Sequence, residues 1–131
     1  MTATDGMSDS DASERNGYLT TTGRVTGRGH EIEIWFAAEP DSGGRTLYLL
    51  AGGRDRSDWV RNVAQNPSVS FRAGETTYRG SARIVTPEEA IDGRSREVVA
   101  SKYGQRDVSG ALNDWARTSL PVVIELVGRD G

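Results

Sequence analysis

The sequence predicts a mainly β fold of the α+β type, a small antiparallel barrel with peripheral helices. About six segments are rich in β-branched or alternating apolar residues and are bounded by turn residues. Few connections are long enough to carry a parallel crossover. One helical segment interrupts the strand series, and one or two more lie near the end of the chain. The 131 residues contain neither an internal repeat nor a sign of a second domain.

Three predicted strands occupy the first half of the chain. Residues 18–22 are β-prone, and a glycine-spaced turn with two arginines follows at residues 23–29. Residues 30–36 alternate, as a half-buried strand does. Residues 40–44 are a predicted hairpin loop that leads into an apolar strand at residues 47–51. The alternation places Ile32, Ile34 and Phe36 on one strand face and Glu31, Glu33 and Trp35 on the other.

Three more strands and a short helix are predicted in the second half. Residues 68–72 and 76–85 form a hairpin, and residues 120–127 form the last strand. The short helix covers residues 110–117, with Ser109 as its cap.

A longer helix has a clear start signal. Thr86 is the predicted N-cap, Pro87 occupies the first helical position, and Glu89 completes a capping box. The helix is predicted to run to Tyr103, because Gly104 is a natural stop.

The centre of the chain has the features of an anion site. Gly52 and Gly53 follow the apolar strand, and Arg54 and Arg56 come directly after them. Free backbone N–H groups at such a turn and guanidinium groups beside it bind anions. The alternative, to which we give equal weight, is that the glycines only make a tight turn and the arginines are solvated.

A short helix follows this turn. Ser57 is its predicted N-cap, Asp58 suits its first turn, and Trp59 and Val63 share one face. Asn66–Pro67 ends it.

Composition excludes several kinds of chemistry. The chain has no Cys and a single His, so it has no disulfide and no thiolate, and zinc ligation by His and Cys is close to excluded. We predict no metal site. No apolar run approaches the roughly 20 residues that span a bilayer, and no secretory signal is evident. A soluble, cytoplasmic protein without a membrane anchor is therefore the expectation.

The charge of the chain is concentrated at its start. Residues 1–16 are acidic and nearly devoid of apolar side chains, so we expect a disordered tail that is dispensable for folding. The remaining residues carry 15 acidic and 15 basic side chains, which argues against nucleic-acid binding. All basic residues but Lys102 are Arg, and an actinobacteria-like genomic base composition explains most of this bias.

Several segments resemble one family of enzymes, the nitroreductases and quinone reductases that depend on the deazaflavin coenzyme F420. Residues 21–28 and 30–36 are similar to its opening. Residues 52–62 with Asn66–Pro67 are similar to its centre, and Lys102–Tyr103 with residues 115–123 to its C-terminal part. The resemblance spans about residues 18–127.

The resemblance implies a split β-barrel over residues 17–131, akin to the FMN-binding barrels of pyridoxamine phosphate oxidases. It places the cofactor phosphate and glutamate tail along the glycine-arginine turn, and the deazaflavin ring in a groove on the barrel. Where the best-known branch has a Lys and a Pro before the Trp, this chain has Arg54, Arg56 and Ser57, which leaves FMN open as the cofactor. The expected cofactor-binding residues are Thr21, Thr22, Arg24, Trp35, Gly52, Gly53, Arg54, Arg56, Asp58, Trp59 and Asn62.

The implied reaction is hydride transfer from reduced F420 to a small electron-poor acceptor such as a quinone, a nitroaromatic or an activated alkene. The proton that the acceptor needs comes from Tyr103, from Lys102 or from water. Trp59 has core packing as its alternative role, and His30 is expected to be a structural strand residue. The alternatives for the whole protein are an FMN-dependent enzyme on the same barrel and a non-catalytic carrier of a flavin or deazaflavin. Barrels of this type pair through a sheet face, so a homodimer is expected.

Overall fold

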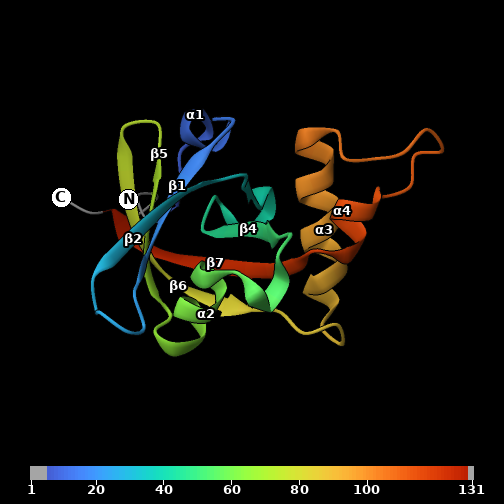
Figure 1. Ribbon diagram of the computed structural model, residues 1–131. Coiled ribbons are helices and arrows are strands. Elements are labelled where there is room, and N and C mark those ends of the chain that lie inside the picture. Colours follow the sequence, from blue (N-terminus) through green and yellow to red (C-terminus); the bar gives the residue numbers. More distant parts are fainter. Residues whose placement is uncertain (1–5, 130–131) are drawn as a thin grey trace.

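A single curled antiparallel sheet forms the frame of the molecule (Figure 1). The computed structural model describes residues 6–129. Seven strands are ordered β2-β1-β5-β6-β7-β4-β3, and all neighbouring pairs are antiparallel. The strands are β1 (Gly17–Thr22), β2 (Gly29–Ile34), β3 (Ala37–Ala38), β4 (Thr46–Ala51), β5 (Ser68–Ala73), β6 (Thr76–Ile84) and β7 (Leu120–Arg129).

Helices cover the ends of this half-barrel. In Figure 1, α3 and α4 stand together at one end, and α2 lies below the sheet near β6. The α-helices are α1 (Asp9–Ala12), α2 (Asp58–Gln65), α3 (Ala90–Tyr103) and α4 (Asp114–Thr118), and two single 3₁₀ turns are η2 (Pro40–Ser42) and η3 (Arg54–Arg56). The predicted antiparallel barrel with peripheral helices is confirmed.

The core has two parts, one on each side of β4 and β7. Strand residues point alternately to the two faces of a sheet. Leu47 and Leu49 therefore belong to one apolar cluster, which includes Phe36 and Phe71. Tyr48 and Leu50 belong to the other cluster, which packs under α3 and α4. Strand β4 is buried along its whole length for this reason, as its unbroken apolar run predicts.

Two helix boundaries differ from the prediction. Helix α3 begins at Ala90, three residues after Pro87, because the chain first makes a separate turn in which the Glu89 carboxylate accepts a 2.9 Å hydrogen bond from the Thr86 N–H. The short helix α4 begins at Asp114. Its cap is Asn113, whose Oδ1 accepts from the Ala116 N–H at 2.9 Å.

The stretch before β1 is the clearest correction. Residues 6–16, expected as a disordered tail, pack against the barrel, whereas residues 1–5 lie outside the described residues. Met7 is only 5% exposed and joins the first cluster, and Ser8 caps α1. The Tyr78 hydroxyl donates a 2.6 Å hydrogen bond to Asp11 Oδ2. This stretch has a low average hydropathy, so its composition did not predict that Met7 is buried in the core or that Asp11 accepts a hydrogen bond from the buried Tyr78.

Candidate functional site

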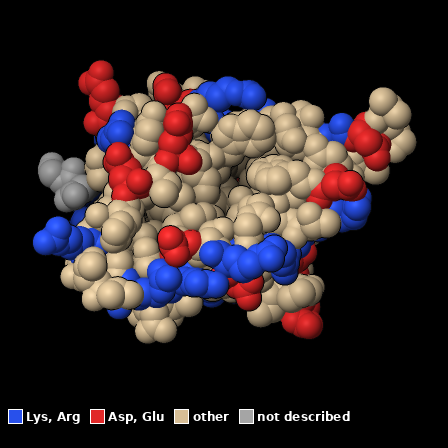
Figure 2. Space-filling view, in the orientation of Figure 1, with Lys and Arg blue, Asp and Glu red and all other residues tan. Residues whose placement is uncertain are grey.

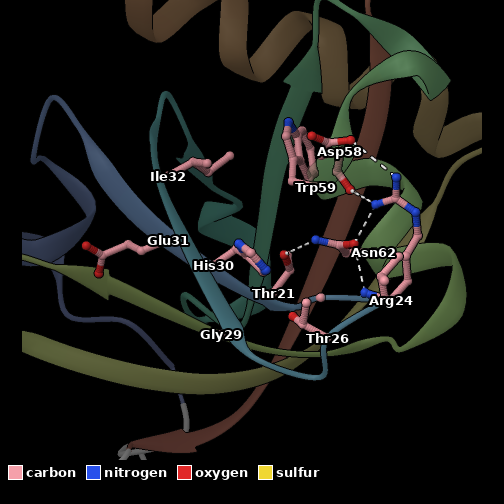
Figure 3. A pocket seen from close by; sticks show the side chains of 12 residues that line it. Thr21, Arg24, Thr26, Gly29, His30, Glu31, Ile32, Asp58, Trp59 and Asn62 are labelled. Carbon is pink, nitrogen blue, oxygen red and sulfur yellow. Dashed lines mark hydrogen bonds and ion pairs between the residues drawn. The ribbon is translucent and has the colours of Figure 1, made fainter.

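A pocket of about 540 Å³ lies between the β1–β2 turn and helix α2 (Figure 3). It gathers residues from β1, the turn, β2 and α2, which are far apart in sequence. Five of the expected cofactor-binding residues line it: Thr21, Arg24, Asp58, Trp59 and Asn62.

The turn itself is built by glycines. The Gly23 N–H donates to the Arg28 carbonyl at 2.7 Å, and the Gly27 N–H donates to the Gly23 carbonyl at 2.8 Å. Gly27 has φ 74°, a left-handed conformation that favours glycine. This geometry closes the hairpin tightly and brings Arg24 against α2.

Asn62 is the centre of the hydrogen bonds in this pocket. It is 3% exposed, and its Oδ1 accepts from the Arg24 backbone N–H at 3.2 Å and from Arg24 Nη1 at 2.8 Å. Its Nδ2 donates to Thr21 Oγ1 at 3.1 Å, as Figure 3 shows. One buried amide thus ties α2 to β1 and to the turn, and it fixes both the main chain and the side chain of Arg24.

Arg24 also pairs with the start of α2. Its Nη2 lies 3.3 Å from Asp58 Oδ1, and the Asp58 side chain is 84% exposed. An exposed partner of this kind is free to leave when an anionic ligand arrives. Asn62 therefore holds the Arg24 guanidinium on its buried side. On its exposed side, a ligand can replace Asp58 as the partner of Arg24.

His30 lines the same pocket, although its position in the sequence predicted a structural strand residue. It pairs with Thr21 across the β1–β2 ladder, and Figure 3 places its ring beside Thr21. A Cβ on Gly23 would lie 2.6 Å from His30 Nε2, so the glycine leaves room for the ring. A signal was present in the sequence: the only histidine follows a turn with two arginines.

The Gly52–Arg56 turn is not part of this pocket. Gly52 lies under Trp115, because a Cβ at this position would be 3.0 Å from the indole Nε1. Arg54 Nη1 donates a 2.5 Å hydrogen bond to the Thr118 carbonyl at the end of α4. Arg56 is exposed. Gly52 and Arg54 thus have packing and capping contacts with the C-terminal part of the chain, whereas Gly53 lies against Ser57.

Thr22 is also separated from the pocket. Neighbouring strand residues point to opposite faces of a sheet, so Thr21 and Thr22 diverge. Thr22 lines a different hollow of about 330 Å³ on the other side of β1, together with Thr20 and Arg79.

Trp35, Tyr103 and Lys102 form a second group, under the segment that precedes β1. The Trp35 and Tyr103 rings stack with centroids 4.3 Å apart, and Trp115 meets Trp35 edge-on. The Tyr103 hydroxyl accepts from the Phe36 N–H at 3.0 Å and lies 2.7 Å from the Arg15 carbonyl oxygen, to which it can donate. The strand expected at residues 30–36 ends at Ile34, so Trp35 leaves the ladder and turns toward α3.

The two candidate proton donors are engaged by the main chain. Lys102 Nζ donates to the Ala12 carbonyl at 3.0 Å and to the Phe36 carbonyl at 2.9 Å. Burial lowers the pKa of Lys102 to about 8, and the neighbouring Arg15 acts in the same direction. Burial raises the pKa of Tyr103 above its ordinary value. The structure does not bring Lys102 or Tyr103 into the pocket beside α2.

Residues 6–129 contain no group of three or more His, Cys, Asp or Glu side chains arranged to hold a metal ion. None of the helices among these residues is long and apolar enough to cross a membrane.

The curled antiparallel sheet with helices at its ends defines a split β-barrel protein. A family model, F420H2-dependent quinone reductase, matches residues 12–126, and the chain belongs to this family. The comparison with curated proteins finds no match.

Solved structures share the fold. An F420 reductase has a TM-score of 0.64 at 14% identity, over 93% of this chain and 94% of that one. A conserved hypothetical protein from Mycobacterium tuberculosis has a TM-score of 0.62 at 24% identity, over 98% and 84%. A structure described as a domain-swapped dimer has a TM-score of 0.64 at 21% identity, over 85% and 80%. These likenesses confirm the split-barrel prediction.

Proposed function

We propose that this protein binds reduced coenzyme F420 and transfers a hydride from it to a quinone or a similar electron-poor acceptor, such as a nitroaromatic or an activated alkene. The match of residues 12–126 to the F420H2-dependent quinone reductase family carries the proposal. A structural neighbour is itself an F420 reductase, which is in keeping with it.

The residues of the pocket beside α2 fit such a cofactor. F420 combines a flat apolar ring with a phosphate and a carboxylate tail, so it needs both apolar walls and cationic donors. Trp59 and Ile32 supply apolar surface, and Arg24 supplies a guanidinium whose open side contacts, within residues 6–129, only the exposed Asp58. The Thr21 and Thr26 side chains add hydroxyl groups. We assign the anionic part of the cofactor to this pocket.

The reduced deazaflavin supplies the hydride when it is bound, and the chain supplies binding, orientation and shielding. Asn62 keeps Arg24 fixed before the ligand arrives, so little freedom is lost on binding. Figure 2 shows a hollow bordered by uncharged residues between the β1–β2 side and α3, with basic side chains along its lower border. This hollow is a suitable place for a flat apolar acceptor.

We propose that water donates the proton to the acceptor. The Tyr103 hydroxyl and Lys102 Nζ both face main-chain carbonyls, and Tyr103 is buried. A donor must reach the acceptor oxygen within hydrogen-bond distance. An open hollow gives solvent that access without any movement of the chain.

Titration with F420 and with FMN tests the proposal. The two oxidised cofactors absorb at different wavelengths, so each bound form is distinguishable. Anaerobic mixing of the reduced complex with a soluble quinone should then return the oxidised deazaflavin spectrum. Tight binding of FMN alone would favour the FMN-dependent alternative, and F420 binding without transfer to quinones, nitroaromatics or activated alkenes would favour a carrier.

We also propose that the protein forms a homodimer. A structural neighbour is described as a domain-swapped dimer, and the sheet offers Val127, 59% exposed, on its outer surface. Light scattering after size-exclusion chromatography measures the mass directly. A mass equal to the 14.2 kDa chain at micromolar concentration would rule out a stable dimer.

A further inference from the structure

The indole N–H of Trp115 is a hydrogen-bond donor that the site described above does not use. An indole nitrogen can only donate, and Trp115 Nε1 has no hydrogen-bond partner among residues 6–129. These residues contain no buried side-chain nitrogen or oxygen that lacks a partner, so the N–H of the half-buried Trp115 reaches the surface. A ligand can therefore accept a hydrogen bond from it.

Gly52 leaves this N–H uncovered. Gly52 is exposed, and a Cβ at its position would lie 3.0 Å from Trp115 Nε1 and 3.4 Å from its Cδ1. The backbone of Gly52 does not have a positive φ, so its conformation does not require glycine. The space beside the indole does require it, because a side chain at residue 52 would crowd the N–H.

Trp115 is held in place from several sides. Arg96 Nη1 donates to three main-chain carbonyls at the end of α4, over distances of 2.7–2.9 Å. The Ser119 hydroxyl donates to the Trp115 carbonyl at 2.6 Å, and the Trp35 ring meets the indole edge-on with centroids 5.5 Å apart. A donor that is fixed before the reaction needs no reorganisation during it.

The surroundings of this donor suit the electron acceptor. Gly52 directly follows β4, and α3 packs against that strand. In Figure 1, β4 lies between the β1–β2 side and α3, which is where Figure 2 shows the hollow bordered by uncharged residues. Trp35 and Trp115 add flat aromatic surface beside it. An acceptor in the hollow can therefore meet both an apolar wall and one N–H donor.

The reaction creates the charge that such a donor stabilises. A C–H bond of the reduced deazaflavin breaks with its electron pair, and the hydride forms a new bond to the acceptor. A quinone thereby gains two electrons, and one of its oxygens becomes negative until water gives it a proton. A hydrogen bond to an ionised oxygen is stronger than one to a neutral carbonyl.

We propose that the Trp115 indole N–H donates a hydrogen bond to the quinone or nitro oxygen that becomes negative as the hydride arrives. This inference rests on the proposed function and adds a catalytic residue to it. Because the bond strengthens as charge develops, it accelerates the hydride step more than it tightens acceptor binding. Gly52 takes part indirectly, since it keeps the N–H accessible.

Trp115→Phe tests the inference, because it keeps an aromatic ring and removes the donor. The full-length protein with bound reduced F420 is mixed anaerobically with menadione, a soluble quinone, at several concentrations. The limiting rate of deazaflavin oxidation should fall about 10- to 100-fold. The half-saturating menadione concentration and the F420 affinity should stay within about twofold of the wild type. The comparison is made at a temperature where circular dichroism shows both proteins to be folded.

Gly52→Ala tests the same contact without changing the indole. The added Cβ would lie against Nε1, so the limiting rate should fall at least about threefold while the F420 affinity is kept. Gly93→Ala is the matched control, because a Cβ at this position in α3 has no heavy atom within 4 Å. It should keep the wild-type limiting rate.

Three results separate this inference from the proposed function. A limiting rate of Trp115→Phe within about twofold of the wild type would overturn the inference and leave the proposed function standing. A loss confined to F420 affinity would do the same, because the N–H would then meet the cofactor and not the acceptor. A wild-type protein that binds F420 but passes no hydride to menadione, nitroaromatics or activated alkenes would overturn the proposed function, and this inference with it.

Discussion

Asn62 Oδ1 accepts two hydrogen bonds from one residue, Arg24, through its backbone N–H at 3.2 Å and its Nη1 at 2.8 Å. The amide is buried, and its Nδ2 donates a hydrogen bond to Thr21 Oγ1. A guanidinium that is held at both its backbone and its side chain is already oriented when a ligand arrives. The contact joins the start of the chain to α2, 38 residues later.

Asn62→Ala should therefore lower both stability and cofactor affinity. We expect a loss of about 1–3 kcal/mol in the free energy of unfolding, because the Thr21 hydroxyl and the Arg24 N–H lose their buried partner. The F420 affinity should fall about tenfold as Arg24 loses its fixed orientation. Urea denaturation and F420 titration measure the two effects.

Asn66→Ala is the matched control for this change. Asn66 follows the same helix, and its Oδ1 accepts a 3.0 Å hydrogen bond from the exposed Ser68 N–H. This variant should keep the wild-type F420 affinity. An equal loss of affinity in both variants would mean that the helix as a whole, and not the Asn62 amide, sets the affinity.

Arg24 and Arg54 should respond differently to replacement by Gln. Arg24→Gln should weaken F420 binding at least tenfold and lower stability by about 1 kcal/mol, because its ion pair with Asp58 is exposed but its Nη1 hydrogen bond to the buried Asn62 Oδ1 is lost. Arg54→Gln removes the hydrogen bond to the Thr118 carbonyl and should leave F420 affinity within about twofold. Fluorescence or absorbance titration compares them. A larger loss of affinity in Arg54→Gln than in Arg24→Gln would show that the cofactor phosphate binds at the Gly52–Arg56 turn instead.

Tyr103→Phe tests whether the tyrosine acts as a proton donor. The change removes a buried hydroxyl that bonds the Phe36 N–H and lies beside the Arg15 carbonyl, so we expect a loss of about 1–3 kcal/mol in unfolding free energy. Quinone reduction, measured well below the melting temperature, should fall less than about threefold if water is the donor. A fall of about 100-fold at a temperature where circular dichroism shows the variant to be folded would assign the proton to Tyr103.

The fold was readable from the sequence because its signals are local. Residues 47–51 are apolar without a break, and a strand buried on both faces has that pattern. Residues 30–34 alternate as an edge strand does, with Ile32 and Ile34 packed against the core. The helix before Asn66 ends where proline requires it.

The site was readable only in part, because its decisive contacts join distant residues. Gly52 and Arg54 look like an anion turn, yet their partners are Trp115 and Thr118 in α4, which no local pattern reveals. The Tyr103 hydroxyl, expected as a proton donor, is hydrogen-bonded to the main chain of residues 15 and 36. Arg24 and Asn62, in contrast, lie within segments that resemble the family, and the structure brings them together.

Removal of residues 1–16 should destabilise the protein, contrary to the expectation from composition. The deletion takes Met7 out of the core and removes the acceptor of the Tyr78 hydroxyl, Asp11. We expect a loss of about 2–5 kcal/mol from the lost burial and the unpaired hydroxyl. Thermal denaturation of the shortened chain measures it. Removal of residues 1–5 alone is the control, and equal stability of both shortened chains would show that the packed segment contributes nothing.

The contact of Glu39 with Arg94 should make stability depend on acid. The Glu39 carboxylate accepts bonds of 2.6 Å and 2.5 Å from the Arg94 guanidinium and one of 3.0 Å from the Tyr48 hydroxyl, and it ties the β3 edge to α3. The hydrogen bond with Arg94 is the largest cause of the lowered pKa of Glu39, which is about 2.

A lowered pKa in the folded state gives stability that is complete above the ordinary carboxyl value of about 4.5 and is lost as pH falls toward about 2. The contribution is about 2 kcal/mol, since Arg94 is half-exposed and screened by solvent. Glu39→Gln should thus be less stable than the wild type at pH 7, and the difference should shrink between pH 4.5 and pH 2. Urea denaturation across that range measures it, with Glu88→Gln, an exposed residue near the start of α3, as the control. A constant difference between wild type and Glu39→Gln from pH 7 to pH 2 would show that the packing of the side chain, and not its charge, holds α3 to the sheet.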